Sequence, residues 1–214
     1  MVKSFLDIDD LTASELKAVL DLAAMPDPPQ VLAGKAVAVL FEKPSLRTRV
    51  SMEVAVTQLG GHPVSLRDEE VGLDRRESAE DVARVLSRYC VAIGARVFAH
   101  STIERLAAAS SVPVVNLLSD RAHPCQALAD FLTLRQQWGT FAGRRLAYVG
   151  DGNNVCWSLM KAAVALDVEM VVATPMGYEA PLLDGVTFSH DPFEAVSGVD
   201  AIYTDVWTSM GQEG

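Results

Sequence analysis

Four short stretches of this sequence carry side chains that suit the binding of phosphates, carbonyl groups or amines. The first runs from Phe41 to Arg49 as FEKPSLRTR, where a proline is followed by hydroxyl and guanidinium groups. Proline suits the start of a helix, and the free N–H groups and dipole of a helix N-terminus favour a bound anion. Ser45, Arg47 and Thr48 therefore form a candidate anion site. Taken alone, such a cluster is better explained as an ordinary capped helix with solvated arginines.

The second stretch is His-Pro-Cys-Gln at residues 123–126. His123 and Gln126 are three residues apart, so they share a face of a helix and can hydrogen-bond a carbonyl ligand. For a lone histidine, capping of the helix is the favoured alternative. Cys125 and His123 do not form a nucleophile and base, because residues two apart on a helix point away from each other.

Two further stretches lie in the last third of the chain, each directly after a predicted strand. Gly-Asp-Gly-Asn-Asn at 150–154 lacks the third glycine of a dinucleotide fingerprint, so that interpretation is weak. Asn153 and Asn154 suit the head group of an amino acid, and a tight turn with an asparagine cap is the alternative. Asp205 begins DVWTSMG and could pair with an ammonium group, although alone it reads as an ordinary loop residue.

Two arginines receive opposite interpretations. Arg96 stands inside an apolar run, where a charged residue is rarely buried without a partner, so it is expected to face a partner or an anionic ligand. Arg49 and Glu53 are four residues apart and can pair on one helix surface, so Arg49 is interpreted as structural.

The elements that must position these residues alternate between short β-branched runs and helical patterns. Strands are predicted at 35–41, 64–66, 91–98, 112–117, 145–149, 168–173, 186–188 and 201–204. Helices are predicted after a capping box at Thr12 and Glu15, and at 46–59, 78–88, 103–110, 122–138, 153–166 and 193–197, with 67–76 as a loop. This alternation predicts parallel sheets, whose carboxyl ends are where open α/β sheets bind ligands.

A polar, glycine-containing stretch at 139–143 divides the alternation into two parts. The predicted fold class is α/β, with two doubly wound parallel-sheet domains at 1–139 and 140–214. The second is small for such a domain, and it stops after a buried-looking strand with no helix to cover it. We therefore expect the second domain to be incomplete and the chain to be a fragment.

Composition excludes several classes of protein. Half of the residues are apolar, which excludes a disordered chain, and the formal charge of −10 argues against bulk nucleic-acid binding. The scattered cysteines, Cys90, Cys125 and Cys156, are neither a disulfide framework nor a zinc site, and they favour a reducing compartment. With no signal peptide and no apolar run of about 18 residues, a cytoplasmic protein with no membrane partner is expected.

Together and in this order, SLRTR, HPCQ, GDGNN and DVWTSMGQE resemble the aspartate/ornithine carbamoyltransferases over essentially all 214 residues. HPCQ and the last stretch are similar to the ornithine carbamoyltransferases, whereas the aspartate enzymes have HPTQ. Leu46 stands where threonine is commoner in that family, and Gly72 stands where a glutamine would align in a loop that reaches a neighbouring subunit. The family also continues beyond the position of Gly214.

The resemblance implies transfer of a carbamoyl group from carbamoyl phosphate to the δ-amine of L-ornithine, giving L-citrulline and phosphate in arginine biosynthesis. It implies a homotrimer with active sites at subunit interfaces, and neither metal nor organic cofactor. The residues implied to be catalytic are Arg96, His123 and Thr48. Those implied to bind carbamoyl phosphate are Ser45, Leu46 through its backbone, Arg47, Thr48, Arg96, His123 and Gln126. Those implied to bind ornithine are Asn154, Asp205, Ser209 and Met210, in a second, ornithine-binding domain after a first that binds carbamoyl phosphate.

Two alternatives stay open at this point. One is an enzyme of the same superfamily with another amine acceptor, such as aspartate, putrescine or an N-acylornithine. The other is a truncated, inactive chain that binds carbamoyl phosphate or another phosphate without transferring anything.

Overall fold

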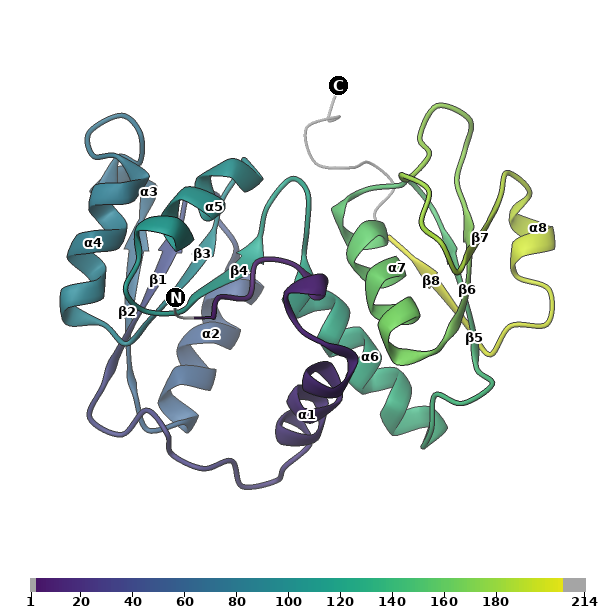
Figure 1. Cartoon of the computed structure of the whole chain (residues 1–214), viewed down its shortest axis with the longest axis horizontal. Coiled ribbons are helices and arrows are strands. Elements are labelled where there is room, and N and C mark those ends of the chain that lie inside the picture. The colour runs from purple at the N-terminus through teal and green to yellow at the C-terminus, as the bar shows by residue number, and fades with distance from the viewer. Residues whose placement is uncertain (1–2, 206–214) are drawn as a thin grey trace. The chain divides into compact units, whose positions relative to one another are not determined.

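The computed structural model describes residues 3–205 of the 214. Its elements follow one another as a regular alternation of strands and helices (Figure 1). In chain order they are η1 (Ile8–Asp10), α1 (Ala13–Ala23), β1 (Ala36–Phe41), α2 (Leu46–Gln58), β2 (His62–Arg67), α3 (Asp68–Val71), α4 (Ala79–Tyr89), β3 (Ala92–Arg96), α5 (His100–Ala109), β4 (Val114–Leu118), α6 (Pro124–Trp138), β5 (Arg145–Val149), α7 (Asn154–Leu166), β6 (Glu169–Ala173), β7 (Val186–Ser189), α8 (Pro192–Ala195) and β8 (Ala201–Thr204).

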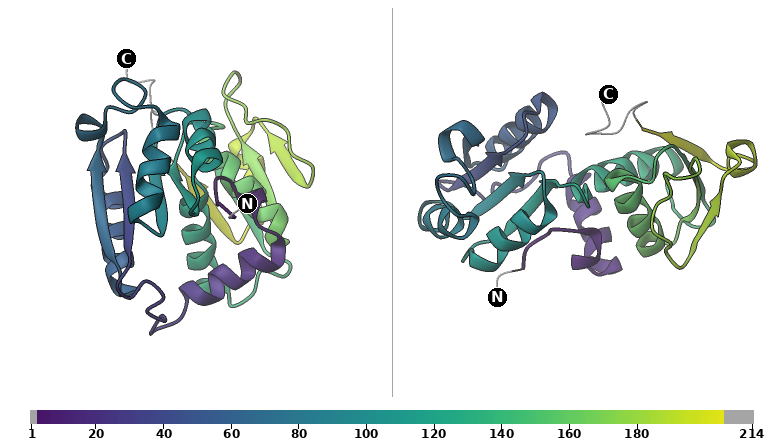
Figure 2. Two further views of the ribbon diagram at one scale, coloured as in Figure 1. Left: turned by 60° about the vertical axis from the view of Figure 1, so that its left-hand side comes forward. Right: turned by 90° about the horizontal axis from the view of Figure 1, so that it is seen from above.

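The first sheet has the strand order β2-β1-β3-β4, and all its pairs are parallel. Alternate residues of β1 face opposite sides of the sheet. Ala38 and Leu40 pack with residues of α4 and α5, whereas Val39 and Phe41 pack with Met52 of α2. Figures 1 and 2 show these helices on the two sides of the sheet. The chain leaves β1 toward β2 and later returns to its other side as β3, so the strand order reverses between β1 and β3.

The second sheet repeats this plan with the order β7-β6-β5-β8, again with only parallel pairs. Helix α7 packs against β6, and the short α8 contacts β5, β6 and β7. The strand order reverses between β5 and β8, where the chain returns after building β6 and β7 on the other side. Two parallel, helix-covered sheets confirm the predicted α/β fold class.

Contacts divide the described chain into two compact units. The first unit consists of residues 3–10 and 21–125, and the second unit consists of residues 11–20 and 126–205. Most of α6 therefore groups with the second sheet, although the stretch at 139–143 that suggested a boundary follows that helix. Part of α1 belongs to the second unit as well, where the Arg135 guanidinium donates to the Leu20 carbonyl at 2.6 Å.

Local rules account for several helix ends. The predicted capping box is confirmed, because the Glu15 carboxylate accepts from the Thr12 N–H at 2.8 Å and Thr12 Oγ1 accepts from the Glu15 N–H at 3.3 Å. The prediction of a plain loop at 67–76 was wrong, since it contains α3. The Glu70 carboxylate caps this turn by accepting from the Arg67 N–H at 2.8 Å, and Gly72 ends it with a φ of 64°.

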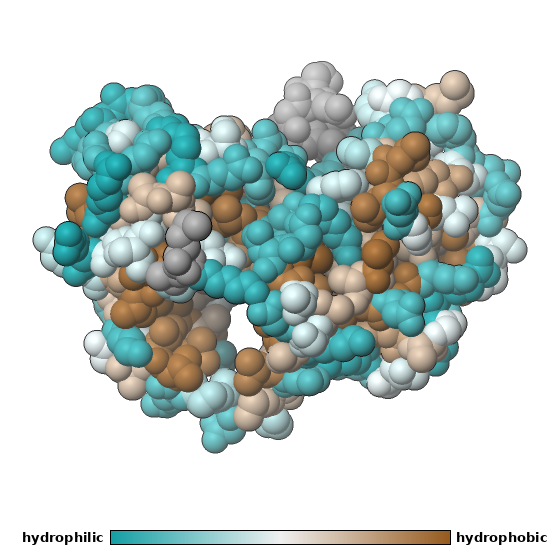
Figure 3. Space-filling view, viewed as in Figure 1, coloured by the Kyte–Doolittle hydropathy of each residue, from teal (hydrophilic) through white to brown (hydrophobic). Residues whose placement is uncertain are grey.

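On the face drawn in Figure 3, brown hydrophobic areas lie among teal hydrophilic ones, as expected when polar groups cannot cover a whole protein surface. None of the helices described between residues 3 and 205 combines the length and the apolar character needed to span a bilayer.

Candidate active site

The first unit gathers hydroxyl and guanidinium groups where the order of its strands reverses. Ser45 caps α2, because its Oγ accepts from the Thr48 N–H at 3.3 Å and donates to the Thr48 Oγ1 at 2.9 Å. The Arg96 Nη1, from the end of β3, donates to the same Thr48 Oγ1 at 3.3 Å. A helix N-terminus, two hydroxyls and a guanidinium thus meet at the carboxyl ends of β1 and β3, where open α/β sheets bind ligands.

Arg96 is the strongest sign of an anionic ligand in this cluster. Its side chain is only 8% exposed, and its buried Nε has no hydrogen-bond partner among residues 3–205. Burial lowers the pKa of the Arg96 guanidinium, and the nearby charge of Arg47 lowers it further. Two cations held together with an unsatisfied buried donor cost free energy that a bound anion would offset.

Leu46 and Arg47 begin α2, and neither side chain is buried. Leu46 is 79% exposed, so its side chain contributes little to a buried site. Its backbone N–H lies in the first turn of α2, where N–H groups lack partners within the helix. The geometry is therefore compatible with the backbone role that the sequence suggests for Leu46.

His123 lies in the same unit, in the loop that leaves β4, the strand beside β3. Ser119 holds this loop in place through hydrogen bonds. Its Oγ accepts from the Asn116 Nδ2 at 3.1 Å and from the Ala122 N–H at 3.2 Å, and it lies 2.7 Å from the His100 Nδ1. This buried polar cluster, which the sequence did not reveal, fixes the backbone from which His123 projects.

Gln126 follows in α6 and belongs to the second unit. Its Nε2 donates to the Asp130 Oδ1 at 2.9 Å, one helical turn further along. Asp130 also receives a hydrogen bond from Tyr203 of β8. The Gln126 contact is readable from the i, i+4 spacing, but the contact with Tyr203 depends on the tertiary fold.

In the second unit, the loops that follow β5 and β8 meet at the other reversal of strand order. Asn153 caps α7, since its Oδ1 accepts from the N–H groups of Val155 and Cys156 at 3.0 and 3.1 Å. Its Nδ2 donates to the Asp205 Oδ2 at 2.6 Å. Asn154 is the first residue of α7. The predicted site residues Ser209 and Met210 lie outside the described residues.

The loop after β5 contains Gly152 because another loop packs closely against it. A Cβ at this position would lie 2.1 Å from the Ala180 backbone nitrogen, far inside van der Waals contact. The Gly152 N–H also donates to the Tyr178 carbonyl at 2.7 Å. The glycine therefore allows the loop before β7 to pack against this turn, which agrees with the weak dinucleotide signal.

The surroundings of Asp205 are negatively charged. Burial raises the pKa of Asp130, hydrogen bonds from Gln126 and Tyr203 lower it, and the charge of Asp205 raises it again. Burial and the nearby Asp130 also raise the pKa of Tyr203. Two carboxylates that lie close together favour a cationic ligand, such as an ammonium group.

The cysteines do not supply a nucleophile. Burial raises the pKa of the Cys125 thiol to about 12, and it does the same for Cys156. A thiol with such a pKa is protonated near neutrality and therefore a weak nucleophile. This agrees with the expectation that Cys125 and His123 form no catalytic pair.

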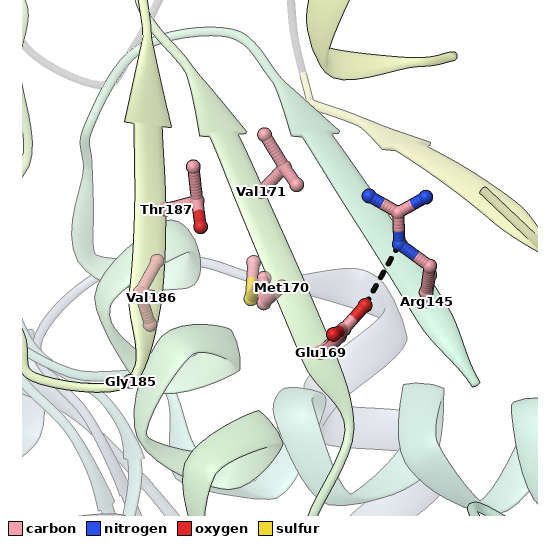
Figure 4. A pocket seen from close by; sticks show the side chains of 7 residues that line it. All are labelled: Arg145, Glu169, Met170, Val171, Gly185, Val186 and Thr187. Atoms are coloured by element: carbon pink, nitrogen blue, oxygen red, sulfur yellow. Dashed lines mark ion pairs between the residues drawn. The ribbon is translucent and has the colours of Figure 1, made fainter. Parts of the chain in front are cut away.

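A separate pocket of about 330 Å³ lies at the amino ends of β5, β6 and β7, at the edge of the sheet opposite Asn153 and Asp205 (Figure 4). Its two charged residues form an ion pair, with Arg145 Nε 2.8 Å from Glu169 Oε2. The remaining lining is apolar apart from Thr187. The paired charges make this pocket a weaker candidate than the two strand-order reversals.

Comparisons with known proteins agree with this geometry. Residues 3–136 match the family model described as the carbamoyl-phosphate-binding domain of aspartate/ornithine carbamoyltransferase, and residues 142–214 match its aspartate/ornithine-binding domain. The chain is 52% identical to an ornithine carbamoyltransferase of Thermus thermophilus and 48% identical to one of Pyrococcus horikoshii, covering 99% of this chain and 73% of each relative.

Solved structures give the same result. The ornithine carbamoyltransferase of Pyrococcus furiosus superimposes with a TM-score of 0.93 at 46% identity, over 99% of this chain and 74% of that one. The Thermus thermophilus enzyme superimposes with a TM-score of 0.91 at 50% identity, over 97% of this chain and 75% of that one. By sequence and by fold, the chain belongs to the aspartate/ornithine carbamoyltransferase family.

Proposed function

We propose that this chain transfers the carbamoyl group of carbamoyl phosphate to the δ-amine of L-ornithine, giving L-citrulline and phosphate. One observation carries the proposal: each sheet places a site of opposite character where its strand order reverses. The first is cationic, with the buried Arg96 beside Thr48, and the second is anionic, with Asp205 held by Asn153. Relatives named ornithine carbamoyltransferase at about half identity support the same reaction.

Carbamoyl phosphate is proposed to bind at the cationic site beside Arg96. Ser45, the Leu46 backbone and Arg47 bind its phosphate at the N-terminus of α2. Arg96, His123 and Gln126 surround the carbamoyl group, together with the Thr48 hydroxyl. The Arg96 Nε, which has no partner among residues 3–205, and the lowered pKa of that guanidinium support this assignment, because an arriving anion would satisfy the donor and stabilise the buried charge.

The proposed chemistry needs no protein nucleophile. The lone pair of a neutral δ-amine attacks the carbamoyl carbon, and a C–N bond forms. The bond from carbon to the phosphate oxygen breaks, phosphate leaves with the electron pair, and the amine loses a proton. Negative charge that develops on the carbonyl oxygen is stabilised by Arg96, His123 and Thr48, in the manner of an oxyanion hole. Orientation of two bound substrates supplies much of the acceleration.

The second site is proposed to hold ornithine through Asn154, Asp205, Ser209 and Met210, with Asp205 on the α-ammonium group. The negative surroundings of Asp205 support this role. We also propose the division into a carbamoyl-phosphate domain at 1–139 and an ornithine domain at 140–214. The family models support this division, since their matches end at 136 and begin at 142.

A homotrimer is the proposed assembly. An exposed apolar stripe on α2 supports self-association: Leu46, Val50 and Val54 are spaced four residues apart and are 79%, 51% and 47% exposed. Such a stripe on a helix suits contact with a second copy of the chain. We propose cytoplasmic arginine biosynthesis as the setting. Three unpaired thiols support a reducing compartment, and the "anabolic" Pyrococcus furiosus relative supports biosynthesis.

The test is a colorimetric assay of citrulline with carbamoyl phosphate and a panel of amines: ornithine, putrescine, aspartate and N-acetylornithine. Citrulline from ornithine, and little ureido product from the other amines, is the expected result. A larger kcat/KM for another amine would show that this amine, and not ornithine, is the acceptor. Binding of carbamoyl phosphate with no product from any amine would favour the inactive phosphate-binding alternative.

A further inference from the structure

The contact between Gln126 and Asp130 decides which half of the Gln126 amide is presented to a ligand. The Gln126 Nε2 donates to the Asp130 Oδ1 at 2.9 Å. A carboxylate can only accept hydrogen bonds, so the amide nitrogen must face Asp130. Because the amide group is planar, its Oε1 then points away from Asp130, where it can accept from another donor.

Asp130 is itself held from a second element. Tyr203 of β8 hydrogen-bonds to its carboxylate, and the Tyr203 ring stacks on Tyr148 with centroids 5.9 Å apart. The Asp130 Oδ2 is buried and has no hydrogen-bond partner among residues 3–205. A carboxylate with one unsatisfied buried oxygen, close to the charge of Asp205, lowers stability. The contacts with Gln126 and Tyr203 nevertheless hold its orientation.

We propose that Asp130 is a positioning residue that makes Gln126 select the amino group of carbamoyl phosphate. The inference rests on the proposed function, in which Gln126 contacts the carbamoyl group. The carbamoyl NH₂ is a donor, and it matches an Oε1 that is held in place as an acceptor. Acetyl phosphate has the same phosphate and carbonyl groups but carries a methyl group in place of the NH₂.

A fixed acceptor discriminates between these two ligands. With acetyl phosphate the Gln126 Oε1 would face a methyl group and lose its donor, and an unpaired buried acceptor weakens binding. Without Asp130, the amide can rotate and present either half. Selection for the amino group then falls, whereas contacts to phosphate stay as they were.

The experiment measures dissociation constants of carbamoyl phosphate and acetyl phosphate by calorimetry, without ornithine. The variants are Asp130→Ala, Asp130→Asn, Gln126→Ala and the double variant with alanine at both positions. Gln136→Ala, at an exposed position of the same helix, is the matched control. Asp130→Asn keeps the size of the side chain but offers a donor as well as an acceptor, so it no longer forces the Gln126 Nε2 to face it. It serves as a second test should Asp130→Ala fold poorly.

The unaltered chain and Gln136→Ala should bind carbamoyl phosphate at least about tenfold tighter than acetyl phosphate. In Asp130→Ala and in Asp130→Asn the ratio should fall to about threefold or less, mainly through weaker carbamoyl phosphate binding. In the Gln126→Ala background, removal of Asp130 should leave the ratio unchanged, because the two residues act through one amide.

Three results would overturn this inference, and each differs from failure of the proposed function. Full discrimination in Asp130→Ala, with citrulline formation intact, would show that Asp130 does not orient Gln126. An equal loss of affinity for both ligands in Asp130→Ala would show that Asp130 acts only on stability. The same conclusion would follow if removal of Asp130 lowered the binding ratio as much in the Gln126→Ala background as in the unaltered chain. An unaltered chain that binds neither ligand and forms no citrulline would instead refute the proposed function.

Discussion

Replacement of Arg96 by methionine should stabilise the ligand-free chain while removing its affinity for phosphate. Methionine keeps much of the length and apolar character of the arginine side chain but removes the charge. The ligand-free chain then no longer buries an unsatisfied Nε beside the charge of Arg47. The hydrogen bond from the Arg96 Nη1 to the Thr48 Oγ1 at 3.3 Å is lost in exchange.

The expected changes in melting temperature and in phosphate affinity follow from these contacts. An unsatisfied buried polar group costs about 1–3 kcal/mol, and a hydrogen bond contributes about 1 kcal/mol. A net gain of about 1 kcal/mol raises the melting temperature by about 2–4 °C in a chain of this size. Charge-assisted contacts contribute about 1.5–3 kcal/mol to binding, so the dissociation constant for inorganic phosphate should rise by about 10- to 100-fold.

The assay is thermal unfolding with and without inorganic phosphate, together with calorimetric titration. Arg49→Met is the matched control, because Arg49 lies on α2 in an exposed ion pair with Glu53 at 2.9 Å. It should change neither phosphate affinity nor the melting temperature appreciably. A lower melting temperature for Arg96→Met with phosphate affinity retained would refute the reasoning, since Arg96 would then be a structural residue rather than an anion ligand.

Three further outcomes are expected elsewhere in the chain. Asp205→Asn should raise the KM for ornithine about tenfold or more and leave carbamoyl phosphate binding within about twofold; an equal loss for both substrates in steady-state kinetics would make Asp205 structural. Gly152→Ala should lower the melting temperature and lose activity, because its methyl group would overlap the Ala180 backbone; an unchanged melt would contradict this close approach. Arg105 holds the pKa of Glu80 at about 2, so the ion pair stabilises the fold above the ordinary pKa of 4.5 and this stabilisation is lost as pH falls toward 2. Arg105→Met should therefore flatten the pH dependence of the midpoint of urea unfolding between these two pH values. An unaltered profile would exclude the ion pair.

Much of the fold follows from local pattern. The run at 146–149 is apolar and follows two arginines, and β5 covers this run together with Arg145. The asparagine and serine caps of α7 and α2 follow equally from the chemistry of their side chains, which satisfy free N–H groups. The short α3 was missed because three acidic residues followed by one valine show no helical periodicity, and the Glu70 carboxylate caps this turn.

The sites are only partly readable, because they depend on the order of strands. Asn153 and Asp205 are 52 positions apart, and they meet because β8 pairs with β5. Alternation of strands and helices predicts a parallel sheet without specifying which strands are neighbours. The buried network of Ser119 with Asn116 and His100 was missed for the same reason, since an asparagine within a strand and a serine just after it give no sequence signal of their burial.

The most direct test of the proposed reaction follows the carbon atom that is transferred. Carbamoyl phosphate labelled with ¹³C at the carbamoyl carbon is mixed with the chain and ornithine, and carbon NMR records the products while phosphate is measured in parallel. The proposed function predicts labelled citrulline and phosphate in equal amounts, with both falling sharply in Arg96→Met. Release of phosphate without labelled citrulline, or undiminished citrulline from Arg96→Met, would contradict it.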